Sequence, residues 1–279
     1  MAPVRTSAPA GIRKWNKLKR LNRLFSAAAA ALCGLLLPAA QPSAAQDSNA
    51  ARPFVVLELF TSQGCSSCPP ADKLLREVAE KARREKSRIY PLSFHIDYWN
   101  YIGWTDPYSG ANASARQRAY AAAMNESGVY TPQLVVNGAQ HFPGTRARQL
   151  QAAITSSLSH TPKADVSLSG VEKVSAKELK VRYSYSGAAK NSLLRLALVN
   201  SPDPNYVSRG ENAGSTLSHT NVVRVFKTVE LVQGSGSGEV SLELPDGFTH
   251  SNAQIISLVQ NKANMHIDGA SSIDLSEVL

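Results

Sequence analysis

The chain has 279 residues, of which 43% are hydrophobic and 18% are charged, and this composition excludes a wholly disordered protein. Its length allows one large domain or two ordinary ones. The formal net charge of +9 comes mainly from residues 1–45, which hold seven basic residues and no acidic one. The remaining 23 basic and 21 acidic residues nearly balance, which argues against a nucleic-acid partner.

Residues 1–45 have the layout of a secretory signal peptide. A cationic stretch precedes 14 uncharged, mostly apolar residues at 24–37, which end at Pro38, and small residues lead up to Ala45. We therefore expect cleavage after Ala45, a linker at 46–52, and a periplasmic or secreted protein. The apolar core is too short for a comfortable transmembrane helix, so we expect no stable membrane span after cleavage. An uncleaved anchor is the alternative, because the basic region is long.

Residues 53–160 alternate between strand and helix patterns. Residues 54–60 are apolar on both faces, as expected of a central strand, and a helix pattern follows at 71–82. Further segments are a strand at 88–95, a helix at 112–124, a hairpin at 133–142 around Asn137-Gly138, and a helix at 144–158. This order predicts an α/β domain.

From residue 161 the pattern changes to short strands separated by turns. Residues 179–185 alternate between apolar and polar side chains, and further strands are predicted at 193–199, 221–231, 239–244 and 253–259. No convincing helix lies between them. We therefore predict an all-β sandwich-like domain at 161–279.

Two cysteines remain after the predicted cleavage, Cys65 and Cys68, in the spacing C-x-x-C. A disulfide across two residues constrains the unfolded chain very little, and two cysteines cannot complete a structural zinc site. The spacing suits a dithiol that cycles between open and closed forms. A static disulfide and a metal site are the alternatives.

Polar residues lie within the first predicted strand and at the end of the second. Glu58 lies seven residues before Cys65, and a buried carboxylate there could exchange a proton with Cys68. The alternative is a paired or edge-exposed glutamate. His95 and Asp97 lie two positions apart at the end of the second strand, where active sites gather in α/β sheets. They are predicted to lie near Cys65, or else to form a hydrogen-bonded structural pair.

Aromatic residues concentrate at 98–104, and we expect most of them in the core with one tryptophan, such as Trp99, beside the dithiol. A second polar segment, Glu211, Asn212, His219 and Asn221, is typical of turns. The functional alternative is that this segment packs over the site of the first domain.

Residues 57–72, Leu-Glu-Leu-Phe-Thr-Ser-Gln-Gly-Cys-Ser-Ser-Cys-Pro-Pro-Ala-Asp, resemble the domain-of-unknown-function 1223 family of exported, thioredoxin-like bacterial proteins. The resemblance extends to residues 95–101, 103–104, 106–107, 116–120, 210–214 and 219–224. It touches both predicted domains and implies an α/β thioredoxin-like fold for 53–160. The family name implies no specific function.

The resemblance also implies roles near the dithiol. Thr131-Pro132 is similar to the loop that faces the dithiol in thioredoxin-like folds, so we expect a cis bond there, with Pro132 barring metals and docking a partner strand. Cys65 is expected to be the more exposed thiol and the nucleophile, and Cys68 the resolving thiol. Because prolines follow Cys68 directly, the helix is predicted to begin at Pro69 or Pro70 rather than at Cys65.

These observations predict an exported thiol–disulfide oxidoreductase or redox partner that acts on exported protein thiols or disulfides. No organic cofactor is expected, since no glycine-rich nucleotide fingerprint follows a strand, and the leading interpretation includes no metal. Two alternatives remain. One is a non-enzymatic interaction module with a fixed disulfide, and the other is a copper or zinc carrier that uses Cys65, Cys68 and His95.

Overall fold

The computed structural model describes residues 52–250 and 252–277. The predicted signal peptide and its cleavage site lie outside the described residues. None of the helices within the described ranges is both long enough and apolar enough to cross a membrane.

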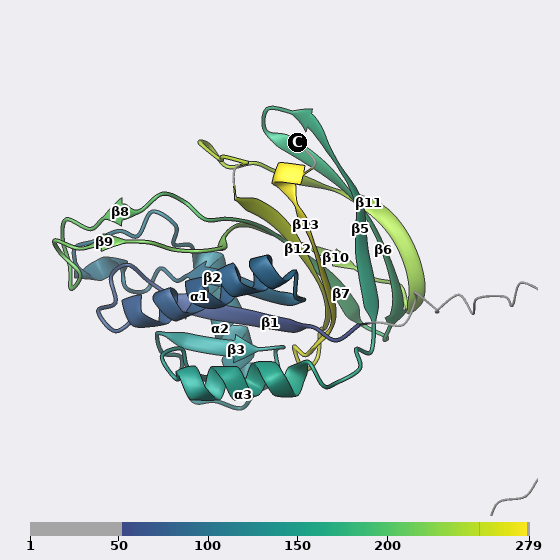
Figure 1. The fold of residues 1–279 in the computed structure, drawn as a ribbon, viewed down its shortest axis with the longest axis horizontal. Coiled ribbons are helices and arrows are strands. Elements are labelled where there is room, and N and C mark those ends of the chain that lie inside the picture. Colours follow the sequence, from purple (N-terminus) through teal and green to yellow (C-terminus); the bar gives the residue numbers. More distant parts are fainter. Residues whose placement is uncertain (1–51, 251, 278–279) are drawn as a thin grey trace, which may run out of the picture. The chain divides into compact units, whose positions relative to one another are not determined.

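The first half of the described chain builds four neighbouring strands of one sheet (Figure 1). β1 (Val55–Thr61) pairs in parallel with β2 (Ile89–His95) and antiparallel with β3 (Gln133–Val136), which pairs with β4 (Gln140–Pro143). The helices are α1 (Pro69–Glu85), the short 3₁₀ helix η1 (Asn100–Ile102), α2 (Ala111–Ala123) and α3 (Ala147–Ser157). The order of strands and helices is the one predicted for this half.

The second half extends the same sheet. β7 (Ser192–Asn200), β10 (Val222–Glu230), β12 (Ala253–Asn261) and β13 (Ile267–Asp274) complete the order β13-β12-β7-β10-β2-β1-β3-β4. A separate three-stranded sheet holds β5 (Asp165–Ser175), β6 (Glu178–Ala188) and β11 (Gly234–Glu243). The remaining elements are the short strands β8 (Asn205–Tyr206) and β9 (Thr216–Leu217) and the 3₁₀ helix η2 (Leu275–Glu277).

The predicted fold class, an α/β thioredoxin-like domain followed by an all-β sandwich-like domain, is therefore wrong. One mixed sheet takes four strands from each half. The two halves of the sheet meet between β2 and β10. There the Ser93 amide donates to the Asn221 carbonyl oxygen, and the Asn221 side chain donates to the Pro91 carbonyl oxygen. A sheet edge at β2 would expose unpaired backbone groups, and β10 pairs with that edge at Ser93, opposite Val222. The domain boundary at residue 160 stays a sequence prediction, and the sheet runs across it.

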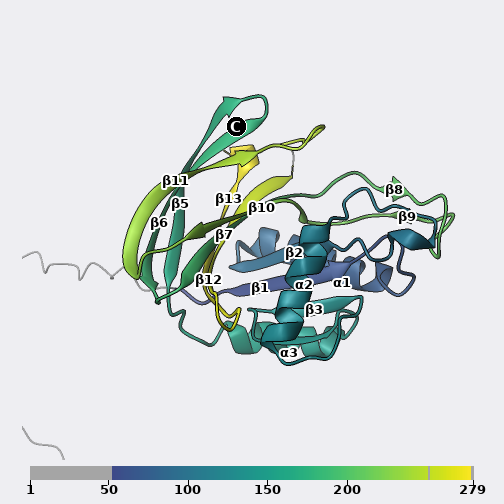
Figure 2. The same cartoon turned by 180° about the vertical axis from the view of Figure 1, so that it is seen from behind.

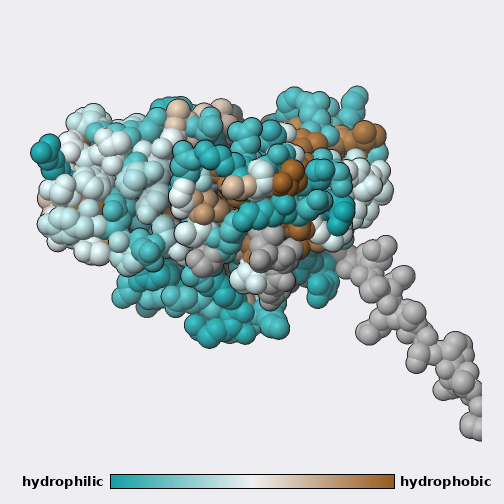
Figure 3. All heavy atoms as spheres, turned by 90° about the horizontal axis from the view of Figure 1, so that it is seen from above, coloured by the Kyte–Doolittle hydropathy of each residue, from teal (hydrophilic) through white to brown (hydrophobic). Residues whose placement is uncertain are grey.

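Helices cover both faces of the β1 region. Because alternate residues of a strand point to opposite faces, Leu57 and Leu59 pack under α1 and α3 while Val56 and Phe60 pack under α2. Figure 2 shows α2 crossing the face opposite α1. A third cluster lies between the three-stranded sheet and strands β7 and β12. Figure 3 shows a largely hydrophilic surface on which hydrophobic residues form a few separate patches.

Candidate active site

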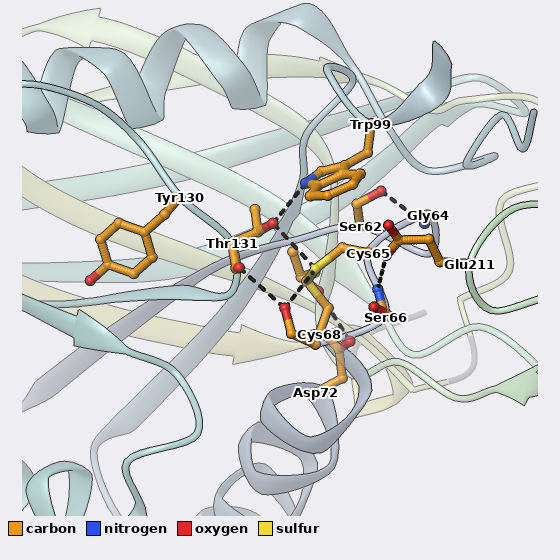
Figure 4. Close-up of a disulfide and its surroundings, with 12 residues drawn as sticks. Ser62, Gly64, Cys65, Ser66, Cys68, Asp72, Trp99, Tyr130, Thr131 and Glu211 are labelled. Carbon is orange, nitrogen blue, oxygen red and sulfur yellow. Dashed lines mark hydrogen bonds between the residues drawn. A yellow bond between two sulfur atoms is a disulfide. The ribbon is translucent and has the colours of Figure 1, made fainter. Parts of the chain in front are cut away.

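Cys65 and Cys68 form a disulfide at the junction of β1 and α1 (Figure 4). α1 begins at Pro69, as predicted, and Cys68 is its N-cap residue. Both cysteines are almost fully buried, with 1% and 0% of their surface exposed, whereas Ser66 between them is exposed. Burial therefore does not distinguish the two thiols, and the expectation that Cys65 is the more exposed one stays a prediction.

The two sulfur atoms have different surroundings. The Thr131 hydroxyl donates to Cys65 Sγ at 3.3 Å, and Ser67 Oγ lies 3.2 Å from the same sulfur. Thr131 Oγ1 in turn accepts a hydrogen bond from Trp99 Nε1 at 2.8 Å, a chain that Figure 4 shows. No side chain among residues 52–250 and 252–277 makes such a contact with Cys68 Sγ. Hydrogen bonds to an anionic sulfur favour its ionised form, so the surroundings favour a thiolate at Cys65 after reduction.

Thr131 and Pro132 lie where the resemblance placed them. The peptide bond between them is cis, as predicted, and Pro132 is buried. The Pro132 carbonyl oxygen accepts the Gly144 amide at 2.9 Å, which ties this loop to the segment before α3. The role of Pro132 in docking a partner strand stays a prediction.

A loop from the second half covers the C-x-x-C segment. This cover loop, residues 201–221, connects β7 to β10. The Asn212 side-chain amide donates to the carbonyl oxygens of Gln63 and Cys65 at 2.9 and 3.0 Å. The Glu211 carboxylate accepts the Ser66 amide at 2.9 Å, and this bond lowers the pKa of Glu211 below its usual 4.5. The functional alternative for this segment, that it packs over the site of the first half, is the observed arrangement.

Gln63 joins the C-x-x-C segment, the η1 region and the cover loop. Its backbone amide donates to Asp106 Oδ2 at 2.8 Å, and its Nε2 lies 3.1 Å from His219 Nε2. Its Oε1 accepts hydrogen bonds from Trp104 Nε1 at 3.1 Å and Asn205 Nδ2 at 2.8 Å. Gln63 is fully buried, so its polar groups cannot bind water and these bonds supply their partners. The network therefore holds three distant chain segments together.

His95 is buried and paired with Asp106 rather than with a cysteine. Its Nδ1 lies 2.7 Å from Asp106 Oδ2. Burial by itself lowers the pKa of His95, but the neighbouring Asp106 carboxylate outweighs it, and the pKa is raised. Burial acts in the opposite direction on Asp106, yet His95 and two backbone amides hold the pKa of this carboxyl below its usual range. The arrangement favours an ion pair that is joined to the C-x-x-C segment through the Gln63 amide, which donates to Asp106.

Of the other two residues predicted near Cys65, Trp99 lies near it and Asp97 does not. Trp99 reaches the disulfide through Thr131, as described above. Asp97 instead accepts a hydrogen bond from Ser114 in α2 at 2.5 Å. His95 and Asp97 thus have separate partners, and the structure does not join them as a pair.

Glu58 lies in a closed ion pair on the α2 side of β1. Arg116 donates to its two carboxylate oxygens at 2.5 and 2.9 Å, and the Tyr120 hydroxyl donates to one of them at 2.5 Å. Burial raises the pKa of Tyr120 well above its usual value, so this hydroxyl remains a donor. Of the two sequence interpretations, the paired glutamate is the one observed.

Sequence reasoning gave no role to Gln63, Asp72 or Asp106. Asp72 is buried in α1 and accepts a hydrogen bond from the Thr61 hydroxyl at 3.0 Å. A carboxylate next to the apolar face of an amphipathic helix was an available signal for Asp72. Gln63 and Asp106 lie in loops, where polar residues are expected and carry no periodic signal.

The copper or zinc alternative relied on three predicted ligands. Among the described residues, no three His, Cys, Asp or Glu side chains form a group that could hold a metal ion. His95, the predicted third ligand, has Asp106 as its partner and lies against the ring of His219.

Comparisons with known proteins support the DUF1223 part of the resemblance seen in the sequence. A crystal structure of protein AGR_C_4864 from Agrobacterium tumefaciens is 28% identical, with a TM-score of 0.62, and the match covers 82% of this chain and 97% of that one. A structure of HBP35 from Porphyromonas gingivalis is 17% identical, with a TM-score of 0.62, over 82% and 77% of the two chains, which shows a shared fold alone. No curated protein matches the chain. The family described as "Protein of unknown function (DUF1223)" matches residues 56–260, which include both cysteines and the cover loop, and the chain therefore belongs to the DUF1223 family.

Proposed function

We propose that this protein is an exported thiol–disulfide exchange protein that uses Cys65 as nucleophile and Cys68 as resolving thiol. The observation that carries the proposal is that side-chain hydroxyl groups contact the sulfur of Cys65 but not that of Cys68 within the described residues. Hydroxyl groups of Thr131 and Ser67 contact Cys65 Sγ, and these contacts would stabilise a Cys65 thiolate. A stabilised thiolate attacks disulfides at neutral pH, where an ordinary thiol is mostly protonated.

The exchange proceeds in two balanced steps. The Cys65 thiolate attacks a substrate disulfide, forms a mixed disulfide and releases one substrate sulfur as a thiolate. The Cys68 thiolate then attacks Cys65 Sγ, which closes the Cys65–Cys68 disulfide and releases the second substrate sulfur. The substrate gains the two electrons that the protein loses. The oxidised protein can run the same steps in reverse and oxidise a substrate dithiol.

Access to the sulfurs requires movement, since both cysteines are buried in the disulfide form. The exposed Ser66 and Ser67 show that the loop between the cysteines already meets solvent. Among the described residues, Glu211 and Asn212 bind the backbone of this segment directly, and Asn205 and His219 of the cover loop contact the Gln63 side chain. Displacement of the cover loop is therefore part of the proposed exchange.

Export is supported by the sequence of residues 1–45, with its basic region, short apolar core and small residues before Ala45. An oxidising compartment would supply partner thiols and disulfides. The mass of the mature chain, isolated from the exported fraction, tests this part directly. A mass that begins at Gln46 is expected, and a chain retaining residues 1–45 contradicts it.

One observation favours a second candidate function, an interaction module with a fixed disulfide. Near-complete burial of both cysteines protects a disulfide from exchange. In that case the cover loop would be a permanent part of the surface and the disulfide would never turn over.

Replacement of the resolving thiol separates the two candidates. Under the proposal, Cys68→Ser traps mixed disulfides with exported proteins, because Cys65 still attacks and nothing resolves the product. Non-reducing gels after acid quenching report the trapped species, and Cys65→Ser is the matched control that should trap none. Trapping by Cys65→Ser alone would reverse the assignment, and absence of trapping in both would favour the fixed disulfide.

A further inference from the structure

A cavity of about 540 Å³ lies beside α2, on the face of the sheet that Figure 2 presents. Strands β7 and β10 contribute Arg195, Arg224 and Phe226 to its lining. Its volume falls within the range of sites that enclose small organic molecules. Neither Cys65 nor Cys68 lines it, so the proposed exchange chemistry does not use this cavity.

Three arginines line the cavity, and only one of them is neutralised. Arg116 forms the ion pair with Glu58. Arg195 donates to the neutral oxygens of Gln260 and Thr228, and Arg224 donates to Asn200. Within residues 52–250 and 252–277, no carboxylate forms a salt bridge with Arg195 or Arg224. The cavity therefore carries two guanidinium groups that are not directly paired with a carboxylate of the described chain.

The two unneutralised arginines lie at separate positions along the ladder of β7 and β10. Arg195 pairs with Thr228 of β10, and Arg224 lies four positions earlier on that strand. At about 3.3 Å per residue, roughly 13 Å of backbone separates these positions. Arg224, Phe226 and Thr228 are alternate residues of β10, so they lie on one face of the strand and line the same cavity.

Each arginine is held in place by an aromatic ring. The Arg195 guanidinium carbon lies 5.8 Å from the Phe226 ring centroid, and that of Arg224 lies 5.4 Å from the Tyr108 centroid. Burial, followed by repulsion from Arg116, lowers the pKa of Arg195, although Tyr120 and Glu58 act in the opposite direction. A carboxylate beside Arg195 would favour its charged form.

Further donors lie at the Arg224 end. Gly110 is the N-cap of α2 and has no side chain to accept the first-turn amides, and both Gly110 and Asn112 line the cavity. His95 also lines it, and its buried Nε2 has no hydrogen-bond partner among the described residues. Phe94, Val223, Phe226 and Met265 contribute apolar surface to the lining, and Ser109 and Thr228 add further hydroxyl groups.

From this arrangement we infer that the cavity binds an elongated organic dicarboxylate, with one carboxylate on Arg195, the other on Arg224, and an apolar middle against Phe94 and Phe226. Two negative charges match the two unneutralised guanidinium groups, and bidentate arginine–carboxylate contacts are among the stronger polar interactions in proteins. The apolar part of the lining gives the carbon chain of such a ligand a surface to pack against.

Calorimetric titration of the oxidised mature chain with linear dicarboxylates from adipate to sebacate tests the inference. We expect saturable binding of at least one member, which suberate represents by its length. Octanoate, which has a single carboxylate, should bind at least about tenfold more weakly, and uncharged 1,8-octanediol should not bind measurably. Raising the salt concentration should weaken dicarboxylate binding further.

Two substitutions locate the site. Arg195→Gln and Arg224→Gln should each weaken dicarboxylate binding about tenfold or more, while Arg148→Gln, an exposed arginine of α3, should leave it unchanged. If either variant unfolds, shifts of the arginine Nε–Hε NMR signals in the wild-type chain report the same contacts. The inference is overturned if no dicarboxylate binds saturably, if octanediol binds as well as suberate, or if Arg148→Gln weakens binding equally.

Discussion

The side-chain amide of Asn212 donates to the carbonyl oxygen of Cys65 at 3.0 Å, across 147 positions of the chain. The same amide also binds the carbonyl oxygen of Gln63. A residue from the second half of the protein thus fixes the backbone on which the proposed nucleophile lies. This contact makes access to the disulfide a property of the cover loop, residues 201–221, as much as of the C-x-x-C segment.

Asn212→Ala should speed reduction of the Cys65–Cys68 disulfide by dithiothreitol about fivefold or more. The substitution leaves two carbonyl oxygens without their donor, and an unsatisfied buried polar group costs about 1–3 kcal/mol. A cover loop weakened by that amount opens more often. The measurement is the rate of thiol appearance under native conditions.

Gln149→Ala, which removes an exposed amide from α3, is the matched control and should leave the rate unchanged. If Asn212→Ala is reduced no faster than wild type at the same folded fraction, the cover loop does not limit access to the sulfurs.

Thr131→Val should raise the pKa of the Cys65 thiol in the reduced protein by roughly 0.5–1 unit. The substitution keeps the shape of the side chain but removes the hydroxyl that donates to Cys65 Sγ. One such hydrogen bond contributes about 1 kcal/mol, and one pKa unit corresponds to about 1.4 kcal/mol. The pH dependence of iodoacetamide alkylation measures the effect. Thr145→Val, at an exposed position, serves as control, and equal thiol pKa values in wild type and Thr131→Val would contradict the assignment.

Asp106→Asn should remove a pH dependence of stability. Because the pKa of His95 is raised, its contribution is fully present below pH 6.5 and is lost as the pH rises through the raised value. Because the pKa of Asp106 is lowered, its contribution is present above pH 3.8 and is lost as the pH falls through the lowered value. Urea unfolding at pH 5.5 should therefore show a loss of about 3 kcal/mol or more in Asp106→Asn.

The loss of unfolding free energy in Asp106→Asn should be smaller at pH 8.5, where His95 is closer to neutral and depends less on a counter-charge. The control is Asp246→Asn, which removes an exposed partner of Lys177 and should change stability by no more than about 0.5 kcal/mol. A loss in Asp106→Asn that is the same at both pH values would mean that His95 and Asp106 do not form an ion pair.

Glu58→Gln should destabilise the fold by about 3–5 kcal/mol, because it leaves the buried Arg116 guanidinium without its counter-charge. It should not change the pH profile of thiol reactivity at matched folded fraction, since Arg116 and Tyr120 occupy the carboxylate. Glu80→Gln, on the exposed side of α1, is the control for stability. A shifted reactivity profile in Glu58→Gln would restore the proton-exchange role that the sequence suggested.

Local patterns predicted the elements that depend on local interactions. The apolar run at 54–60 corresponds to β1, and the two prolines after Cys68 placed the start of α1 correctly. Asn137 and Gly138 both adopt positive φ, as the predicted hairpin turn requires. In each case the deciding interaction lies within a few residues.

The prediction of the fold class failed because it depends on pairing between strands that lie far apart in the sequence. β10 reads as an ordinary strand, and nothing in its alternation indicates that Val222 pairs with Ser93 of β2. The site shows the same division. The cysteine pair and the contact of Thr131 could be anticipated from a motif, whereas the positions of Gln63 and Asp106 depend on loops that meet only in the folded chain.

The reduction potential of the mature protein tests the central claim, that the Cys65–Cys68 disulfide is a reversible redox couple, most directly. The measurement is an equilibrium titration against glutathione or dithiothreitol buffers, with the thiol state read by alkylation and mass. The account predicts a potential between about −120 and −270 mV, the range of proteins that exchange disulfides. A potential below about −300 mV would contradict it and identify the disulfide as a fixed structural bond.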